Sequence, residues 1–157
     1  MTAVVVIRPA NAADAGAIVE LESHFPSDRM SARSVRSFLS STAARVLIAE
    51  GDGRLIGNLI LLMPARWRTS RIYSVVVDPQ ARGFGAGRAL VLAAEQCARE
   101  TGRDSIFLEV RVDNAAARAM YEKLGYAKES ELPRFYEDGV DGLRLRKELR
   151  IPAPLGT

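Results

Sequence analysis

The sequence predicts one α/β (α+β) domain in which helices cover both faces of a mixed sheet. Two observations predict this class. Some apolar runs of strand length stand close together around tight turns, which indicates hairpins, and others are separated by helical stretches, which indicates crossovers. The predicted order of elements over the 157 residues is β-α-α-β-β-β-α-β-α-β-β. Because no linker or repeat interrupts this order, we expect a single domain over 1–150 and a loose C-terminal tail over 151–157.

The chain opens with a short strand and a helix. Ala3–Arg8 is mostly apolar and stops at Pro9, which favours a strand that ends there. Asn11 or Asp14 can cap the following helix, because a short polar side chain accepts hydrogen bonds from the free N–H groups of the first turn. We expect this helix to reach about Ser23.

A second short helix and three strands follow. Ser31 is the candidate cap of the helix. Apolar runs over 45–50 and 55–63 flank Gly51-Asp52-Gly53, which is a strong hairpin signal because these residues adopt positive φ at little cost. A further strand is expected over 72–78.

The second half of the chain alternates helices with strands. In chain order we expect a helix over about 87–100, a strand over 105–112, a short helix that Asp113 or Asn114 caps and that ends at Gly125, and strands over about 126–131 and 143–149.

Composition excludes several classes of function. The single cysteine, Cys97, rules out an internal disulfide and favours a reducing compartment, so we expect a cytoplasmic protein. No apolar run approaches the ~20 residues that a membrane-spanning helix needs. The net charge of +3 comes from scattered basic residues without interleaved aromatic ones, so nucleic-acid binding is not indicated. With one histidine, one cysteine and dispersed carboxylates, we expect no metal site.

The most informative stretch is the glycine-rich segment Arg82-Gly83-Phe84-Gly85-Ala86-Gly87-Arg88, between a predicted strand and a predicted helix. Glycines at alternate positions remove the side chains that would keep a ligand away from the backbone. The N–H groups of the first helical turn have no intrahelical partner and lie at the positive end of the helix dipole. The segment therefore predicts a binding site for the pyrophosphate of a nucleotide-like cofactor.

Two common nucleotide sites fit this segment poorly. A P-loop requires a lysine and then a serine or threonine after its last glycine, but Gly87 precedes Arg88 and Ala89. A dinucleotide motif requires G-x-G-x-x-G directly after the first strand, whereas this turn reads G-x-G-x-G and follows the fourth. A nicotinamide-binding protein is therefore only a weak alternative.

Five motifs stand out, and they are Val75-Val76-Val77-Asp78-Pro79, Arg82-x-x-Gly85-x-Gly87, Leu108-Glu109-Val110-Arg111, Asn114-x-x-Ala117 and Tyr121-Glu122-Lys123-Leu124-Gly125-Tyr126. Together these motifs resemble the GNAT superfamily of N-acetyltransferases. The second motif resembles the family's coenzyme A pyrophosphate signature, which also fits two residues earlier, over Gln80–Gly85. Within the superfamily, the sequence looks most like the RimI-type protein N-terminal (ribosomal-protein-alanine) acetyltransferases. The resemblance implies a GNAT-like mixed, mostly antiparallel sheet of six to seven strands with helices on both faces.

The resemblance also implies an acyltransferase that uses acetyl-CoA as co-substrate. The pantetheine arm would pair with the backbone of one strand, and the Val77 amide would polarise the acetyl carbonyl. Asn114 falls where the family contacts coenzyme A, although it can equally be a helix cap and nothing more. The residues expected to bind the cofactor are Val75, Val76, Val77, Arg82, Gly83, Phe84, Gly85, Ala86, Gly87, Arg88 and Asn114.

Glu109 is the candidate general base. Acetyl transfer requires a base that removes the amine proton, and a carboxylate inside the fold suits the relay of that proton through water. Phe107 and Glu109 are expected on one face of their strand, with the apolar residues on the other. The RimI-type resemblance points to the same residue. The alternative is a glutamate that is solvated at the strand end or paired with Arg111.

Tyr121 is the candidate acid that protonates the departing thiolate. Helical spacing is expected to place Tyr121 and Asn114 on the face away from the core, while Ala116, Met120 and Leu124 form the buried stripe. Family members place a tyrosine here, beside the thioester sulfur. The alternative is a tyrosine that packs at the seam between helix and sheet.

His24, Phe25 and Tyr136 are the candidate substrate-binding residues, because they match loops that line the acceptor groove in family members. We expect a protein N-terminal α-amine as the acceptor, with a small-molecule amine or an antibiotic as the alternative. A non-catalytic acyl-CoA-binding module is the rival from another class, although it would need neither candidate catalytic residue. Cys97 is expected to be a core residue rather than an acyl carrier, because it continues an apolar helical stripe.

Overall fold

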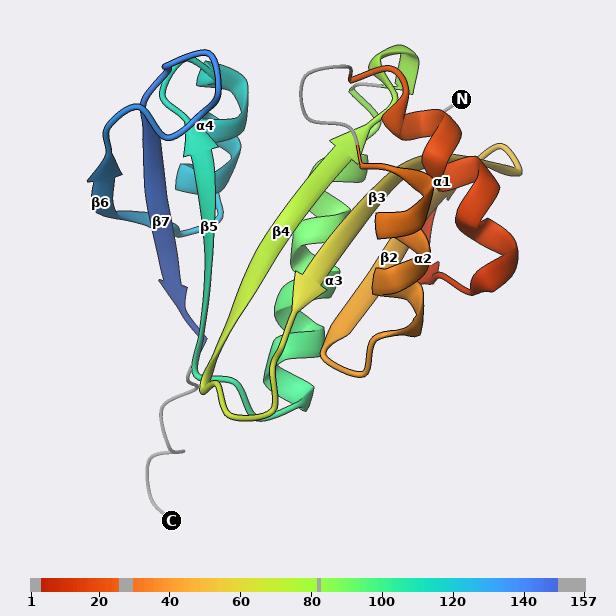
Figure 1. The fold of residues 1–157 in the computed structure, drawn as a ribbon, viewed down its shortest axis with the longest axis horizontal. Coiled ribbons are helices and arrows are strands. Elements are labelled where there is room, and N and C mark those ends of the chain that lie inside the picture. Colours follow the sequence, from red (N-terminus) through yellow and green to blue (C-terminus); the bar gives the residue numbers. More distant parts are fainter. Residues whose placement is uncertain (1–3, 26–29, 82, 150–157) are drawn as a thin grey trace.

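The computed structural model describes residues 4–25, 30–81 and 83–149, which form one curved sheet with helices on both sides (Figure 1). The predicted fold class is therefore confirmed. In chain order the elements are β1 (Val5–Pro9), η1 (Ala12–Asp14), α1 (Ala15–Glu22), α2 (Ala32–Ser40), β2 (Ala44–Gly51), β3 (Arg54–Leu62), β4 (Thr69–Val77), η2 (Pro79–Ala81), α3 (Ala86–Glu100), β5 (Ser105–Arg111), α4 (Ala115–Lys123), β6 (Ala127–Leu132) and β7 (Gly142–Glu148).

Local signals explain how these elements begin and turn. Asn11 caps the 3₁₀ turn that leads into α1, because its side chain accepts from the Ala13 N–H at 2.9 Å. Ser31 caps α2 as expected. Asp52 and Gly53 have φ values of 52° and 76°, so the β2–β3 hairpin turns through the positive-φ region that its sequence predicts. The expected C-terminal tail, 151–157, lies outside the described residues.

The seven strands form one sheet in the order β1-β2-β3-β4-β5-β7-β6. Every neighbouring pair is antiparallel except β4 and β5, which run parallel. The sheet is thus mixed and mostly antiparallel, as the motifs imply. The one parallel pair is joined through α3, because parallel neighbours need a long crossover.

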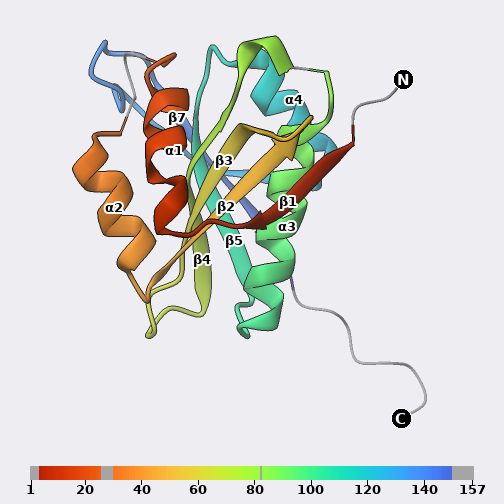
Figure 2. The same cartoon turned by 90° about the vertical axis from the view of Figure 1, so that its right-hand side faces the viewer.

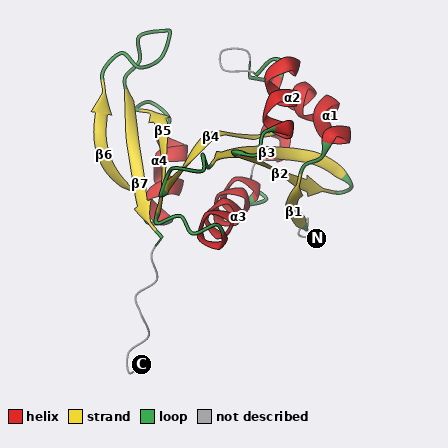
Figure 3. Ribbon diagram, turned by 60° about the horizontal axis from the view of Figure 1, so that its bottom comes forward, coloured by secondary structure: helices red, strands yellow, loops and turns green. Residues whose placement is uncertain are grey.

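The helices divide between the two faces. Figures 2 and 3 show α1 and α2 on one face and α3 and α4 on the other. The larger core lies beneath α3 and contains the fully buried Leu90, Ala94 and Ile106. The smaller core lies beneath α1 and α2 and contains Ile18, Val35 and Ile60. None of the helices within the described ranges combines the length and apolar character that crossing a membrane requires.

The central feature of the sheet is that β4 and β5 pair only at their beginnings. Thr69–Arg71 pairs with Ser105–Phe107, and β4 and β5 form no further pairs with each other beyond these residues. Figure 1 shows the two strands meeting at one end and separating toward the other. β4 begins at Thr69, earlier than the expected 72, because this short paired stretch belongs to it. The sheet therefore opens between two strands that remain paired to β3 and β7 on their outer sides.

Candidate active site

A cavity of about 1060 Å³ occupies the opening between β4 and β5. Its walls come from these two strands, the glycine-rich segment, the start of α2, α4 and the β6–β7 loop. The cavity collects most of the predicted site residues. Those that line it are Phe25, Val75, Val76, Val77, Gly83, Gly85, Ala86, Gly87, Arg88, Glu109, Asn114, Tyr121 and Tyr136.

Three of the predicted residues are not placed in this wall. His24 is exposed and does not line the cavity. Phe84 points to solvent, with 48% of its surface exposed, and is likewise absent from the lining. Arg82 lies outside the described residues.

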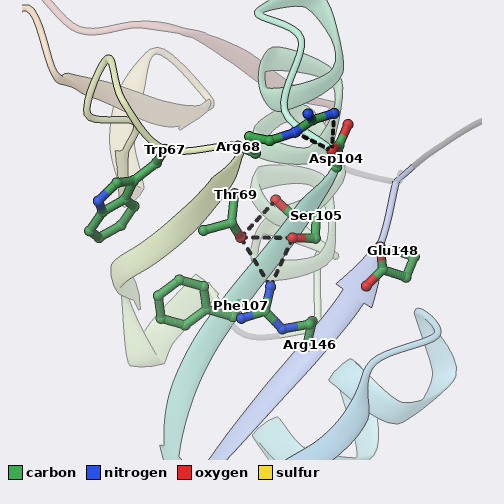
Figure 4. Close-up of a pocket in the computed structure, with 8 residues that line it drawn as sticks. All are labelled: Trp67, Arg68, Thr69, Asp104, Ser105, Phe107, Arg146 and Glu148. Atoms are coloured by element: carbon green, nitrogen blue, oxygen red, sulfur yellow. Dashed lines mark hydrogen bonds and ion pairs between the residues drawn. The ribbon is translucent and has the colours of Figure 1, made fainter.

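A smaller cavity of about 500 Å³ lies at the closed end of the opening (Figure 4). Several of its polar groups bond to one another. The Arg146 guanidinium donates to Ser105 Oγ at 2.8 Å and to Thr69 Oγ1 at 3.2 Å, and Ser105 Oγ donates to Thr69 Oγ1. Since none of the predicted catalytic residues lines this cavity, the larger one is the candidate active site.

The backbone of β4 presents unpaired groups to the larger cavity. The Asp78 N–H donates to the Ile56 carbonyl at 2.7 Å, so it points toward β3. Because successive N–H groups of a strand point to opposite sides, the Val77 N–H points away from β3. On that side β5 has already diverged. This direction is compatible with the expected role of the Val77 amide as donor to an acyl carbonyl.

The glycine-rich segment adopts the backbone that only glycine tolerates well. Gly83 and Gly85 have φ values of 95° and 77°, and a Cβ at either position would meet no atom within 4 Å. Their glycine identity thus follows from the conformation rather than from crowding. Gly85 is the N-cap of α3, without a side-chain cap bond, so the first N–H groups of α3 stay free for a ligand. The helix begins at Ala86, one residue before the expected start.

Arg88 is the basic residue that the described structure places at the mouth of α3 and in the cavity wall. An arginine beside free backbone N–H groups at a helix N-terminus favours a bound phosphate. The chemistry of these donors fits the pyrophosphate that the sequence predicted.

Tyr121 lies in the core, and the expected orientation of α4 was wrong. The ring is 6% exposed and belongs to the main hydrophobic cluster, whereas Ala116 is exposed. The stripe that packs inward consists of Ala117, Met120, Tyr121 and Leu124. A run of alanines at the start of α4 gives two registers of similar apolar pattern, and packing against the sheet selects the other one. Tyr121 nevertheless reaches the cavity wall.

The environment of Tyr121 keeps its proton in place. Burial, with a smaller contribution from Tyr136, raises the pKa of Tyr121 to about 12. Its ring packs edge-on against Tyr126, with ring centres 5.4 Å apart. Within the described residues its hydroxyl forms no hydrogen bond, so the proton is available to a ligand in the cavity.

Glu109 is not paired with Arg111, which was the alternative. Arg111 binds Asp113 and Asp138 instead. Glu109 lies on the strand face predicted for it, but two other arginines hold it there. Arg71 Nε donates to Glu109 Oε1 at 2.9 Å, with Arg71 Nη2 on the same oxygen, and Arg144 Nε donates to Oε2 at 3.1 Å. The Glu109 side chain is only 5% exposed.

Sequence reasoning missed both arginines because nothing near them in the chain marks them. Arg71 lies 38 residues before Glu109, on β4, and Arg144 lies directly opposite Glu109 in the β5–β7 register. Tyr73, which also lines the cavity, was missed as well. The one available signal was the position of Arg144 and Arg146 on a half-exposed strand, where alternate residues share a face.

The remaining predicted residues have simple structural roles beside their place in the wall. Asn114 caps α4, because its Oδ1 accepts from the Ala117 N–H at 3.1 Å. Tyr136 packs edge-on against Phe135 and stacks under the Arg111 guanidinium, 5.0 Å from its ring centre. Cys97 packs against the main core and is not in the cavity wall, and burial raises the pKa of its thiol. Residues 4–25, 30–81 and 83–149 contain no grouping of side chains suited to a metal ion.

The model of the acetyltransferase (GNAT) family matches residues 16–126, so the chain belongs to this family and is an N-acetyltransferase. The family uses acetyl-CoA.

Three similar proteins illustrate the relationship. An uncharacterized N-acetyltransferase of Methanocaldococcus jannaschii is 32% identical over 152 residues, covering 96% of both chains. An N-alpha-acetyltransferase of Sulfurisphaera tokodaii is 30% identical over 114 residues, covering 66% of this chain and 68% of that one. The crystal structure of the ribosomal-protein-S18-alanine N-acetyltransferase from Escherichia coli matches with a TM-score of 0.85 at 22% identity, over 98% of this chain and 99% of that one, which is a likeness of fold.

Proposed function

We propose that this chain transfers an acetyl group from acetyl-CoA to a protein N-terminal α-amine by direct attack. The observation that carries the proposal is the convergence on one cavity of the free β4 backbone edge, the α3 N-terminus, Tyr121 and Glu109. A non-catalytic binding module would need the first two features and not the last two. The site therefore favours turnover over binding alone.

The chain's own groups fit the cofactor along its length. The free N–H groups at the start of α3, with Arg88, suit the pyrophosphate. The unpaired edge of Val75–Val77 suits the amide groups of the pantetheine arm, which would complete the missing strand partner. Bound there, acetyl-CoA supplies an activated acyl group on a thiol leaving group.

The reaction requires three groups of the protein to donate or accept hydrogens. The Val77 N–H, directed away from β3, would donate a hydrogen bond to the acyl oxygen as negative charge develops on it. Tyr121 would donate its hydroxyl hydrogen to the departing sulfur. Glu109 would accept the proton that the attacking amine loses, through water, since both of its oxygens already bind arginine.

Phe25 and Tyr136 line the cavity on the side where an amine would approach, together with Met30. An α-amine of pKa ~7.7–8.0 is unprotonated in roughly one molecule in ten at neutral pH, whereas a lysine amine of pKa ~10.4 is unprotonated in fewer than about one in a thousand. An α-amine therefore depends less on a general base, and Glu109, the proposed base, already accepts hydrogen bonds from two arginines. A small-molecule amine is the second candidate, and a cytoplasmic location stays a prediction.

Incubation with acetyl-CoA and a panel of acceptors tests the proposal. The panel contains peptides with a free N-terminus, the same peptides with a blocked N-terminus and an internal lysine, polyamines and an aminoglycoside. Release of free thiol measures turnover. We expect turnover with free N-termini only. Turnover confined to polyamines or the aminoglycoside would reject the protein acceptor, and binding of acetyl-CoA with no turnover on any amine would favour the non-catalytic alternative.

A further inference from the structure

The Arg71–Glu109–Arg144 cluster carries more positive charge than its carboxylate needs. Two guanidinium groups share one carboxylate, so the cluster has a net charge of +1. The other arginines of β5 and β7 are balanced, because Arg146 pairs with Glu129 at 2.8 Å and Arg111 pairs with Asp113 and Asp138. An unbalanced guanidinium beside the proposed reaction centre is therefore a local feature of this cluster.

The surplus charge faces outward while the carboxylate is buried. The side chains of Arg71 and Arg144 are 31% and 36% exposed, against 5% for Glu109. Both arginines use Nε on Glu109, and Arg71 also uses Nη2. In the part of the chain that the structure describes, Arg71 Nη1 and both Nη atoms of Arg144 have no hydrogen-bond partner. A molecule that approaches Glu109 from outside thus meets guanidinium N–H donors first.

Aromatic rings hold these donors in place. The Arg71 guanidinium lies over Tyr73, 5.7 Å from its ring centre, and the Arg144 guanidinium lies over Phe107 at 5.5 Å. Together with the bonds to Glu109, these stacks fix the planes of both groups before any ligand arrives. A guanidinium fixed in this way suits the two oxygens of a carboxylate.

The cluster adjoins the cavity beside Glu109, the proposed base. Glu109 and Tyr73 line the cavity, Arg71 contacts both of them, and Arg144 contacts Glu109. An extended peptide advances ~3.4 Å per residue, so a side chain one or two residues after the reacting α-amine can reach beyond Glu109.

We propose that Arg71 and Arg144 bind a carboxylate carried by the acceptor, and so select N-termini with an acidic side chain at the second or third residue. The inference rests on the proposed function. Glu109 would have two roles. It would accept the proton of the reacting amine, and its hydrogen bonds would orient both guanidinium groups toward the acceptor. The arginines would act on acceptor selection and not on the acetyl group.

Peptides that differ in one residue test the selection. Matched peptides carry Glu, Gln or Lys at position 2 or position 3, and kcat/KM is measured for each. We expect the Glu peptide to be preferred over the Gln peptide by about five- to tenfold, as for one charge-assisted contact at a half-exposed site. Free alanine compared with alaninamide forms a second arm, in which a preference for free alanine would assign the carboxylate to a small amino acid.

Variants connect the preference to the cluster. In Arg144→Gln and, separately, Arg71→Gln, the Glu-to-Gln ratio should fall to about two or less. The ratio cancels any change that either variant makes in the chemical step. Arg45→Gln is the matched control, because Arg45 is exposed on β2 near Cys97, on the opposite face of the sheet, and should leave the ratio unchanged. The preference should also shrink as salt is raised from low concentration to about 0.5 M, because salt screens exposed charges.

The two proposals fail separately. No turnover of any peptide would reject the proposed function. Turnover with a Glu-to-Gln ratio of one or below in the unaltered enzyme, or a ratio that survives in both arginine variants, would overturn the carboxylate site alone. Arg144→Lys is the more conservative variant if Arg144→Gln does not fold. It keeps the positive charge but loses the planar guanidinium group, so it should retain part of the preference.

Discussion

Replacing Tyr121 with phenylalanine removes the hydroxyl and almost nothing else. The ring is buried and packs edge-on against Tyr126, and phenylalanine preserves that packing. The hydroxyl has no hydrogen-bond partner among the described residues, so its loss strands no other group. We expect the free energy of unfolding to change by less than about 1 kcal/mol. Any effect on turnover is then an effect on chemistry.

The structure limits how large that effect should be. The pKa of Tyr121 is about 12, whereas an ordinary thiol has a pKa of ~8.5. Complete proton transfer from this tyrosine to a thiolate would be uphill by ~3.5 pKa units, or about 5 kcal/mol. We therefore expect Tyr121 to act mainly as a hydrogen-bond donor to the departing sulfur. Such a bond to a charged group contributes ~1.5–3 kcal/mol, which corresponds to a fall in kcat of about ten- to 150-fold.

The assay is steady-state thiol release with the best peptide, alongside calorimetric titration of acetyl-CoA into the variant. We expect kcat to fall within that range and the affinity for acetyl-CoA to stay within about twofold, because the donor matters only as charge develops on sulfur. A kcat within about threefold of the unaltered enzyme would refute the reasoning and remove Tyr121 from the mechanism. A fall beyond about a thousandfold would refute the magnitude and assign Tyr121 a full acid role.

Three further predictions concern the fold around the site. Gly85→Ala should lower the free energy of unfolding by about 1–2 kcal/mol and weaken acetyl-CoA binding, because a φ of 77° is strained for alanine although its Cβ has room. Gly16→Ala is the control, since a Cβ there also has room and φ is not positive. It should show neither effect in thermal melts and calorimetry. Because the pKa of Tyr121 is raised in the folded state, its contribution to the free energy of unfolding is fully present below pH ~10 and is lost between about pH 10 and 12. The loss is about 2.7 kcal/mol. Urea titrations at alkaline pH should show that Tyr121→Phe removes this part of the pH dependence. Lys147→Met should cost about 2 kcal/mol in urea unfolding, because the 1% exposed Glu95 carboxylate loses its 2.8 Å ion pair and keeps only Arg99 at 3.6 Å and the Tyr126 hydroxyl at 3.0 Å. Lys128→Met at an exposed pair should cost under about 0.5 kcal/mol, and equal losses would contradict this account.

Local patterns predicted the elements well where one residue decides the outcome. Asn11 caps the 3₁₀ turn before α1, Ser31 caps α2 and Asp52-Gly53 turns the hairpin, while α3 begins one residue before its expected start. Such choices are made within a few residues, by backbone conformation and by hydrogen bonds of the side chain to nearby N–H groups. Alternation along β5 likewise predicted the face of Glu109.

Prediction failed where helical periodicity alone had to choose a face. Ala116 and Ala117 are equally apolar, so the sequence of α4 is compatible with two orientations. Contact with Tyr126 and the main core selects the orientation that buries Tyr121. Tyr121 lines the cavity, but its ring is buried in the core and does not lie on the outer face of α4 that helical spacing predicted.

The sequence by itself determined the glycine-rich helix mouth, the order of strands and helices, and the two candidate catalytic residues, Glu109 and Tyr121, that line the cavity. These depend on neighbours in the chain. The tertiary structure decided the divergence of β4 from β5, the burial of Tyr121 and the placing of Glu109 between Arg71 and Arg144. Each of these depends on residues tens of positions apart, brought together by strand register and core packing, and no local pattern encodes that distance.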